Sequence, residues 1–378
     1  MNATSVSPVS VSLPLHPLDP LTADEIGHAV AIVRKMQAVT DDALFVRVCL
    51  HEPPKEIVLA FREGEPLDRE AFVMLRDRRA RATIEAVVSL GRGVVTSWRE
   101  VSGVQPPITF EEFFACERLV RSSPAWLEAV RKRGVADPEL AMVDPWSAGH
   151  YGPADDPRRR LIRALTWIRT GEDDNGYARP VEGLVALVDM DAMQVVDIED
   201  HGVVPLPPRA GNYSAAALGD PNNVPYVPAG PRTDLQPLEI VQRQGPSFQL
   251  CGHEVRWQKW RLRIGFTPRE GLVLHTVAYE DQERLRPILY RASLSEMVVP
   301  YGDPSPTHWR KNAFDEGEYG IGMLTNSLEL GCDCLGEIRY LDAVVADAEG
   351  KPVTLRNAIC LHEEDFGILW KHTNFRTG

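Results

Sequence analysis

Three acidic residues and two aromatic residues lie next to one another in a short segment near position 315. Asp315, Glu316 and Glu318 fall between Phe314 and Tyr319. A carboxylate packed against aromatic rings is desolvated, which raises its pKa and lets it act as a general base near neutral pH. The alternative is an ordinary solvent-exposed acidic turn, and composition alone favours that alternative.

A second group of residues has the side chains of a metal site. Cys332 and Cys334 are separated by one residue, as are Cys360 and His362. Structural zinc sites favour two or more residues between the first two cysteines, so this spacing is poor for zinc. A disulfide that includes Cys334, or free thiols buried in a sheet, is the alternative interpretation, because the flanking residues are apolar.

Length and composition limit the class of protein. At about 150 residues per domain, 378 residues predict two or three domains. The net charge of −13 excludes a general electrostatic attraction to nucleic acid or anionic membranes. No apolar run approaches the ~18 residues of a membrane span, and residues 1–20 contain no Lys or Arg, unlike a signal peptide. We therefore expect a cytoplasmic protein with neither a nucleic acid nor a membrane as partner.

The sequence patterns of the helices and strands that must position these residues predict an α+β protein. After a flexible leader at 1–15, a first small domain at 16–103 begins with a Thr22–Glu25 capping box and an amphipathic helix. Strand-like runs follow at 44–50, 57–61, 82–88 and 94–98. A second small domain at 104–215 repeats this order, with a capping box at Thr109–Glu112 and strands at 161–168, 183–189 and 194–198.

The composition and the pattern of the sequence change after the second small domain. Residues 216–236 predict a linker rich in Pro, Gly and Asn, and residues 237–378 predict the first part of a large β-sandwich. Alternation of apolar and polar residues at 260–266 is typical of a strand with one buried face. Further strands are expected at 271–279, 287–290, 296–299, 337–341 and 344–346.

Four segments are very similar to the copper- and topaquinone-dependent primary amine oxidases. They are 297–306 (MVVPYGDPSP), 314–320 (FDEGEYG), 326–334 (NSLELGCDC) and 360–365 (CLHEED). These matches are long and closely spaced, and weaker matches extend the resemblance over nearly the whole chain. It implies two small α+β domains ahead of a β-sandwich, and oxidation of a primary amine by O2 to an aldehyde, ammonia and hydrogen peroxide. Copper and topaquinone would be the cofactors, and a homodimer the assembly.

The resemblance also assigns roles to residues. Asp315 matches the base that takes a proton from the substrate carbon of the topaquinone Schiff base, and Tyr301 matches the tyrosine that hydrogen-bonds to the quinone oxygen. Cys334 and Cys360 match a disulfide pair, which would leave Cys332 as a buried thiol. The expected wall of the substrate channel consists of Ala313, Phe314, Tyr319, Phe113 and Tyr177, and for Phe113 and Tyr177 ordinary core packing is the alternative interpretation. Ala313 stands where relatives often carry a bulky gate residue, which predicts a wider passage.

The chain departs from the family pattern at the redox centre. It contains no Asn-Tyr-Asp/Glu-Tyr motif, from which topaquinone forms, and no His-x-His pair for copper. We therefore expect a truncated enzyme that holds the base and the channel wall, binds no metal and is inactive alone. A non-catalytic paralogue that serves as a binding or dimerisation module is the alternative.

Overall fold

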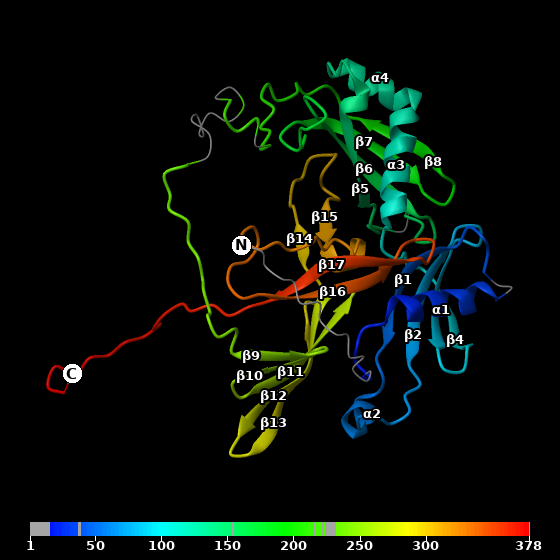
Figure 1. The fold of residues 1–378 in the computed structure, drawn as a ribbon. Helices are drawn as coiled ribbons and strands as arrows, with labels where there is room; N and C mark the ends of the chain where they lie inside the picture. Colours follow the sequence, from blue (N-terminus) through cyan, green and yellow to red (C-terminus); the bar gives the residue numbers. More distant parts are fainter. Residues whose placement is uncertain are drawn as a thin grey trace, which may run out of the picture.

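The structure is a computed structural model that describes residues 16–36, 39–152, 155–214, 216–220, 223 and 232–377. The expected leader at 1–15 and most of 221–231 lie outside the described residues. Short helices lie against two of the antiparallel sheets, and the remaining sheets carry no helical layer of their own among these residues (Figure 1), so the predicted α+β class is confirmed. No helix in the described part of the chain is long and apolar enough to cross a membrane.

The first helix lies across a four-stranded sheet. The elements are α1 (Ala23–Arg34), β1 (Leu44–His51), β2 (Glu70–Asp77), β3 (Ala82–Ser89) and β4 (Val94–Val101), in the sheet order β1-β2-β3-β4. The predicted capping box is present, because the Thr22 side chain accepts from the Glu25 N–H and the Glu25 carboxylate accepts from the Thr22 N–H. Ile26 and Val33 of α1 are buried against Phe45 and Val73 of the sheet.

The predicted strand at 57–61 is wrong. These residues belong to a short helix, α2 (Lys55–Ala60), in which Val58 is buried whereas Ile57 and Leu59 are exposed. A short apolar run carries no period that separates a strand from a helix. Residues 57–60 instead lie in this six-residue helix outside the sheet, with Phe61 as its C-cap, and β1 pairs directly with β2.

A second helical layer covers a second sheet with the same strand order. The elements are α3 (Phe110–Ser122), α4 (Pro124–Lys132), a 3-10 turn (Pro138–Leu140), β5 (Ala141–Ser147), β6 (Leu161–Ile168), β7 (Pro180–Asp189) and β8 (Gln194–Asp200). The sequence analysis did not predict α4 or β5. Trp126 of α4 is fully buried, and its indole N–H donates to Thr166 Oγ1 of β6 at 3.1 Å.

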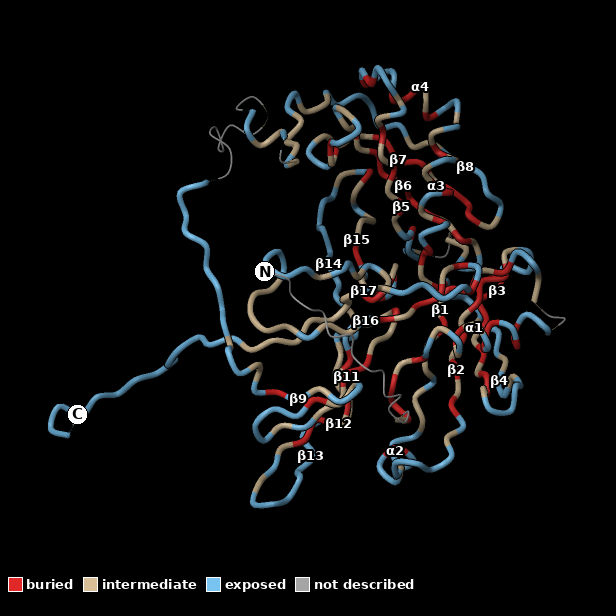
Figure 2. Tube along the Cα trace, viewed as in Figure 1, coloured by how far each residue is buried: buried red, intermediate tan, exposed pale blue. Residues whose placement is uncertain are grey.

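The remaining strands form one larger sheet and two hairpins. The sheet has the order β13-β12-β11-β10-β9, with β9 (Phe248–Cys251), β10 (Glu254–Trp257), β11 (Trp260–Thr267), β12 (Gly271–Asp281) and β13 (Arg284–Ser293). The hairpins pair β14 (Val298–Pro300) with β15 (Asn312–Phe314), and β16 (Arg339–Ala346) with β17 (Pro352–Leu361). Much of β13 and the tail after β17 are exposed (Figure 2). The two strands expected at 337–341 and 344–346 are one strand, β16.

The β16–β17 hairpin packs onto the first domain at its turn. The Phe45 N–H donates to the Ala348 carbonyl oxygen at 2.9 Å. Gly350 in the turn has a φ of +81°, and a Cβ added there would lie 2.7 Å from Val30 Cγ1 of α1. The close approach of the turn to α1 therefore requires glycine.

Gly350→Ala is expected to lower the free energy of unfolding by about 2–4 kcal/mol, from backbone strain and the clash with Val30. Urea unfolding measures the change. Gly64→Ala is the matched control, because Gly64 also has a positive φ but nothing lies within 4 Å of its added Cβ. Equal destabilisation by the two substitutions would show that contact with α1 contributes nothing.

Candidate active site

The β14–β15 hairpin places three of the predicted site residues along one pair of strands, with Tyr301 at its loop end and Asp315 at its open end. Val299 pairs with Ala313, and the Tyr301 N–H donates to the Lys311 carbonyl oxygen at 3.4 Å. Asp315 follows β15 directly as the first residue of α5 (Asp315–Glu318), and its N–H donates to the Met297 carbonyl oxygen at 3.2 Å. Backbone pairing thus fixes the main chain at Tyr301, Ala313 and Asp315 relative to one another.

The second domain holds α5 in place. The Ile108 N–H donates to the Glu318 carbonyl oxygen at 2.6 Å. The Ser147 N–H donates to Glu318 Oε1, and the Tyr319 hydroxyl donates to the Pro145 carbonyl oxygen. The Ser147 N–H and the Pro145 carbonyl oxygen both belong to the end of β5. The orientation of α5 therefore depends on contact between the second domain and the segment that contains α5.

Burial separates the three acidic residues of α5. Glu316 is fully buried, Glu318 is 8% exposed and Asp315 is half-buried. Burial raises the pKa of Glu318 to about 7, and the nearby carboxylates of Asp315 and Glu296 add to the rise, whereas the Ser147 N–H opposes it. Burial and the neighbouring Glu296 carboxyl raise the pKa of Glu316. Desolvated carboxyl groups are therefore present in this segment, but the most deeply buried ones are Glu316 and Glu318, which follow Asp315.

The raised pKa of Glu318 makes stability depend on pH. The folded chain holds a proton there up to about pH 7, whereas the unfolded chain releases it near its ordinary pKa of about 4.3. Stability therefore falls as pH rises across this window, by about 1–3 kcal/mol for this group. Glu318→Gln should reduce that loss when urea unfolding is compared at pH 5 and pH 7.5. Glu349→Gln, at an exposed residue, should leave it unchanged.

The predicted channel residues do not line one common cavity. Tyr319 lines a mainly apolar cavity of about 220 Å³ together with Ile108, Phe110 and Met323, and the Phe113 ring lies 6.3 Å from the Tyr319 ring. Phe314 is 42% exposed and does not line this cavity. Asp315, Tyr301 and Ala313 do not line it either, nor the cavity of about 480 Å³ beside β6.

Tyr177 lies apart from that cavity. Its ring is 5.4 Å from the Trp167 ring, and its hydroxyl is hydrogen-bonded to the Asp144 carboxyl. Burial raises the pKa of Asp144 to about 6. The Trp167 ring is also one of the rings around the Lys311 ammonium, and Tyr301 is another, so Tyr177 approaches the β14–β15 turn through this aromatic group.

Comparison with known proteins gives consistent matches along the chain. Residues 16–101 match the copper amine oxidase N2 domain, residues 111–215 the N3 domain and residues 249–378 the enzyme domain. The chain is 46% identical over 379 residues to the primary amine oxidase of Arthrobacter sp. (strain P1), covering 100% of this chain and 56% of that protein. The chain belongs to the copper amine oxidase family.

Other copper amine oxidases align over a similar extent. The chain is 44% identical to the peroxisomal copper-containing diamine oxidase 1 of Nicotiana tabacum, which covers 96% of this chain and 50% of that protein. The crystal structure of a copper-containing benzylamine oxidase from Hansenula polymorpha matches with a TM-score of 0.82 and 29% identity, over 96% of this chain and 57% of that chain. The chain thus spans about half the length of the curated relatives that it matches.

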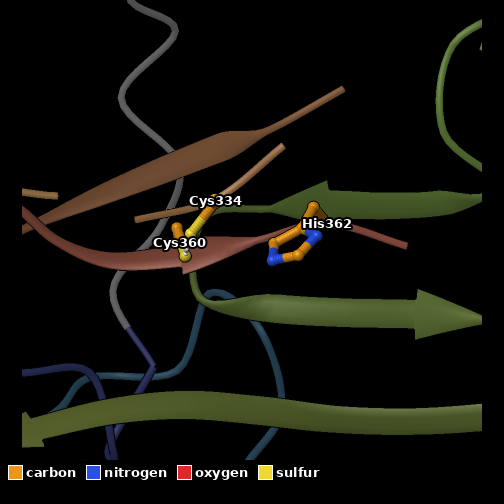
Figure 3. A group of neighbouring side chains, drawn as sticks. All are labelled: Cys334, Cys360 and His362. Atoms are coloured by element: carbon orange, nitrogen blue, oxygen red, sulfur yellow. Dashed lines mark hydrogen bonds between the residues drawn. The ribbon is translucent and has the colours of Figure 1, made fainter. Parts of the chain in front are cut away.

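Three of the predicted cysteine and histidine residues, Cys334, Cys360 and His362, form a close group within the described part of the chain (Figure 3). Ligand atoms of Cys334, Cys360 and His362 lie within 4.8 Å of one another, and the two Sγ atoms are 2.6 Å apart. Cys332, expected to be buried, is exposed and does not belong to the group. It lies in a tight turn, where its N–H donates to the Glu329 carbonyl oxygen at 3.2 Å.

This group does not fit the copper of the family. Two sulfurs and one imidazole differ from the three histidines that the family resemblance implies, and no other such group occurs among the described residues. The sequence also contains no Asn-Tyr-Asp/Glu-Tyr motif for the quinone.

Several residues of the site were missed by the sequence analysis. Asp144, Trp146 and Lys311 surround Tyr301 and Tyr177, although they lie on separate strands or turns. No local motif distinguishes them. The sequence WRK at 309–311, ahead of the acidic segment, is the one signal that could have drawn attention to Lys311.

Proposed function

We propose that the protein is a primary amine oxidase that converts RCH2NH2, O2 and water into an aldehyde, ammonia and hydrogen peroxide. The observation that carries this proposal is the FDEGEYG segment, whose start pairs with the strand that precedes Tyr301 and which is held by the second domain, in a chain 46% identical to a primary amine oxidase. Relatives of the chain include a copper methylamine oxidase, a diamine oxidase and a histamine oxidase, so the proposed substrate class is a primary amine.

Within this proposal, Asp315 accepts the proton that leaves the substrate carbon. The backbone hydrogen bond to Met297 and the turn of α5 hold it close to the end of β15. The Tyr301 hydroxyl offers a hydrogen bond to an oxygen of the organic cofactor. Ala313, Phe314, Tyr319, Phe113 and Tyr177 are the proposed channel wall, and the small side chain of Ala313 would admit a bulky or aromatic amine.

The proposed cofactors are copper and topaquinone, which would supply the two-electron oxidation. Because the described residues contain no three-histidine group, we propose that the 378 residues alone do not turn over. Cys334 and Cys360 are the proposed disulfide pair, supported by the proximity of their sulfurs, and a homodimer is the proposed assembly.

A chimera tests the proposal. The 378 residues are followed by the remaining part of the Arthrobacter sp. (strain P1) enzyme, loaded with copper, and peroxide release is measured with methylamine, n-butylamine and benzylamine. We expect turnover of about 1 s⁻¹ or faster from the chimera and none from the 378 residues. A folded, copper-loaded chimera that is inactive on all three amines contradicts the proposed activity. Equal turnover by the 378 residues alone contradicts the proposed cofactor requirement.

A further inference from the structure

Three aromatic rings surround the side-chain ammonium of Lys311. The distances from Lys311 Nζ to the ring centroids are 4.5 Å for Tyr301, 4.6 Å for Trp146 and 5.7 Å for Trp167. Trp146 and Trp167 lie on β5 and β6 of the second domain, whereas Tyr301 and Lys311 lie between β14 and β15. We call the three rings the aromatic cage. It forms only where the two domains meet.

The aromatic cage has the chemistry of a cation site. Ammonium groups within about 6 Å of a ring centroid are attracted to the negative face of the ring. Among the described residues, no carboxylate oxygen lies close enough to Lys311 Nζ to form an ion pair. The carboxylates of Glu182, Asp144 and Asp303 attract the ammonium from further away. The rings, and not a salt bridge, therefore hold the ammonium.

The space around Lys311 accommodates one ammonium group only. The adjoining cleft, lined by Trp146, Thr307 and Lys311, has a volume of about 10 Å³, which is the room of about one water molecule. A second cation cannot enter while Lys311 stays. A lysine side chain has four rotatable bonds on a flexible stem, so it can leave the cage while its backbone remains paired with Tyr301.

We propose that Trp146, Trp167 and Tyr301 form a binding site for a primary alkylammonium ion, that Lys311 occupies it here, and that the ligand binds by displacing Lys311. The ligand class follows from the present occupant, since a lysine side chain is itself a primary alkylammonium. The importance of the site for catalysis rests on the proposed function, because Tyr301 and Tyr177 are proposed to face the cofactor and the channel. Binding itself requires no turnover.

The test is calorimetric titration of the 378-residue chain with n-butylammonium, which reproduces the carbon chain of lysine. Lys311→Ala empties the aromatic cage and should bind n-butylammonium at least about tenfold more tightly than the unchanged chain. Lys259→Ala is the matched control, because that ammonium lies 5.8 Å from a single ring, that of Tyr279. It should leave the affinity unchanged, and the neutral 1-butanol should not bind Lys311→Ala.

Three results would overturn the proposal. They are equal affinity of Lys311→Ala and the unchanged chain, equal binding of 1-butanol, and undiminished binding when Trp146→Leu is added to Lys311→Ala. If the variants do not fold, NMR of the unchanged chain labelled at lysine Cε decides. The Lys311 resonance should be shifted upfield by the rings and should return toward the ordinary position as n-butylammonium is added. An ordinary, unresponsive resonance refutes the site even where the chimera is an active amine oxidase.

Discussion

Asp315→Asn in the chimera is expected to lower kcat/KM for benzylamine by about 10²–10⁴-fold, the usual contribution of a general base. Asparagine preserves the size of the side chain and the Asp315 N–H bond to Met297, but it cannot accept a proton. Steady-state peroxide release measures the loss. Benzylamine deuterated at the reacting carbon should show a larger isotope effect in the variant, because proton removal becomes slower relative to other steps.

Two further variants give this prediction its control. Asp281→Asn changes an exposed carboxylate of β12, which is paired with Arg286, and should leave kcat/KM unchanged. Glu318→Gln tests the competing base, since the Glu318 carboxyl has a pKa of about 7, which suits proton transfer near neutral pH. A loss of less than tenfold in Asp315→Asn, combined with a large loss in Glu318→Gln, would move the role of base to Glu318.

Glu112→Gln is expected to destabilise the second domain by about 3–5 kcal/mol, because it leaves a buried guanidinium without its counter-charge. Glu112 is 0% exposed and Arg160 is 3% exposed, with oxygen to nitrogen distances of 2.5 and 2.6 Å. Arg160 also donates to the carbonyl oxygens of Pro106 and Pro107 at 2.9 and 2.8 Å. The pair therefore ties the start of the domain, at Pro106, Pro107 and α3, to the start of β6.

Acid should weaken the same pair. Burial alone would raise the pKa of Glu112, but the charge and hydrogen bonds of Arg160 hold it below the ordinary value. The stabilisation is thus complete above the ordinary glutamate pKa and is lost as pH falls through the lower folded value. Urea unfolding followed by tryptophan fluorescence at pH 7 and at about pH 3, below the ordinary glutamate pKa, measures both effects.

The control is a less buried pair in the same sheet. Glu199→Gln interrupts the pair with Arg163, in which the side chains are 24% and 10% exposed, and it should cost less than Glu112→Gln because water solvates the remaining charge. Equal costs for the two substitutions would contradict the importance of full burial. Glutamine still serves in a capping box, so the loss in Glu112→Gln reports the charge and not the helix cap.

The two capping boxes show which features of the structure can be predicted from local sequence. Thr22–Glu25 and Thr109–Glu112 predicted the starts of α1 and α3, and the structure confirms both. The sequence did not indicate that Glu25 also binds Arg69 at 2.6 Å or that Glu112 binds Arg160. A cap joins residues three positions apart, whereas an ion pair between distant residues depends on how the whole sheet is placed.

The sequence by itself determined the family, through long motifs around Asp315, and the α+β class, through capping boxes and the alternation of apolar residues along strands. It failed at 57–61, where a short apolar run has no decisive period. Only the tertiary structure decided that Glu318 is buried under β5, that the Phe113 ring lies near the Tyr319 ring, and that Lys311 enters a cage of rings from two domains. Burial and ring contacts depend on packing between distant segments, and no local pattern encodes that packing.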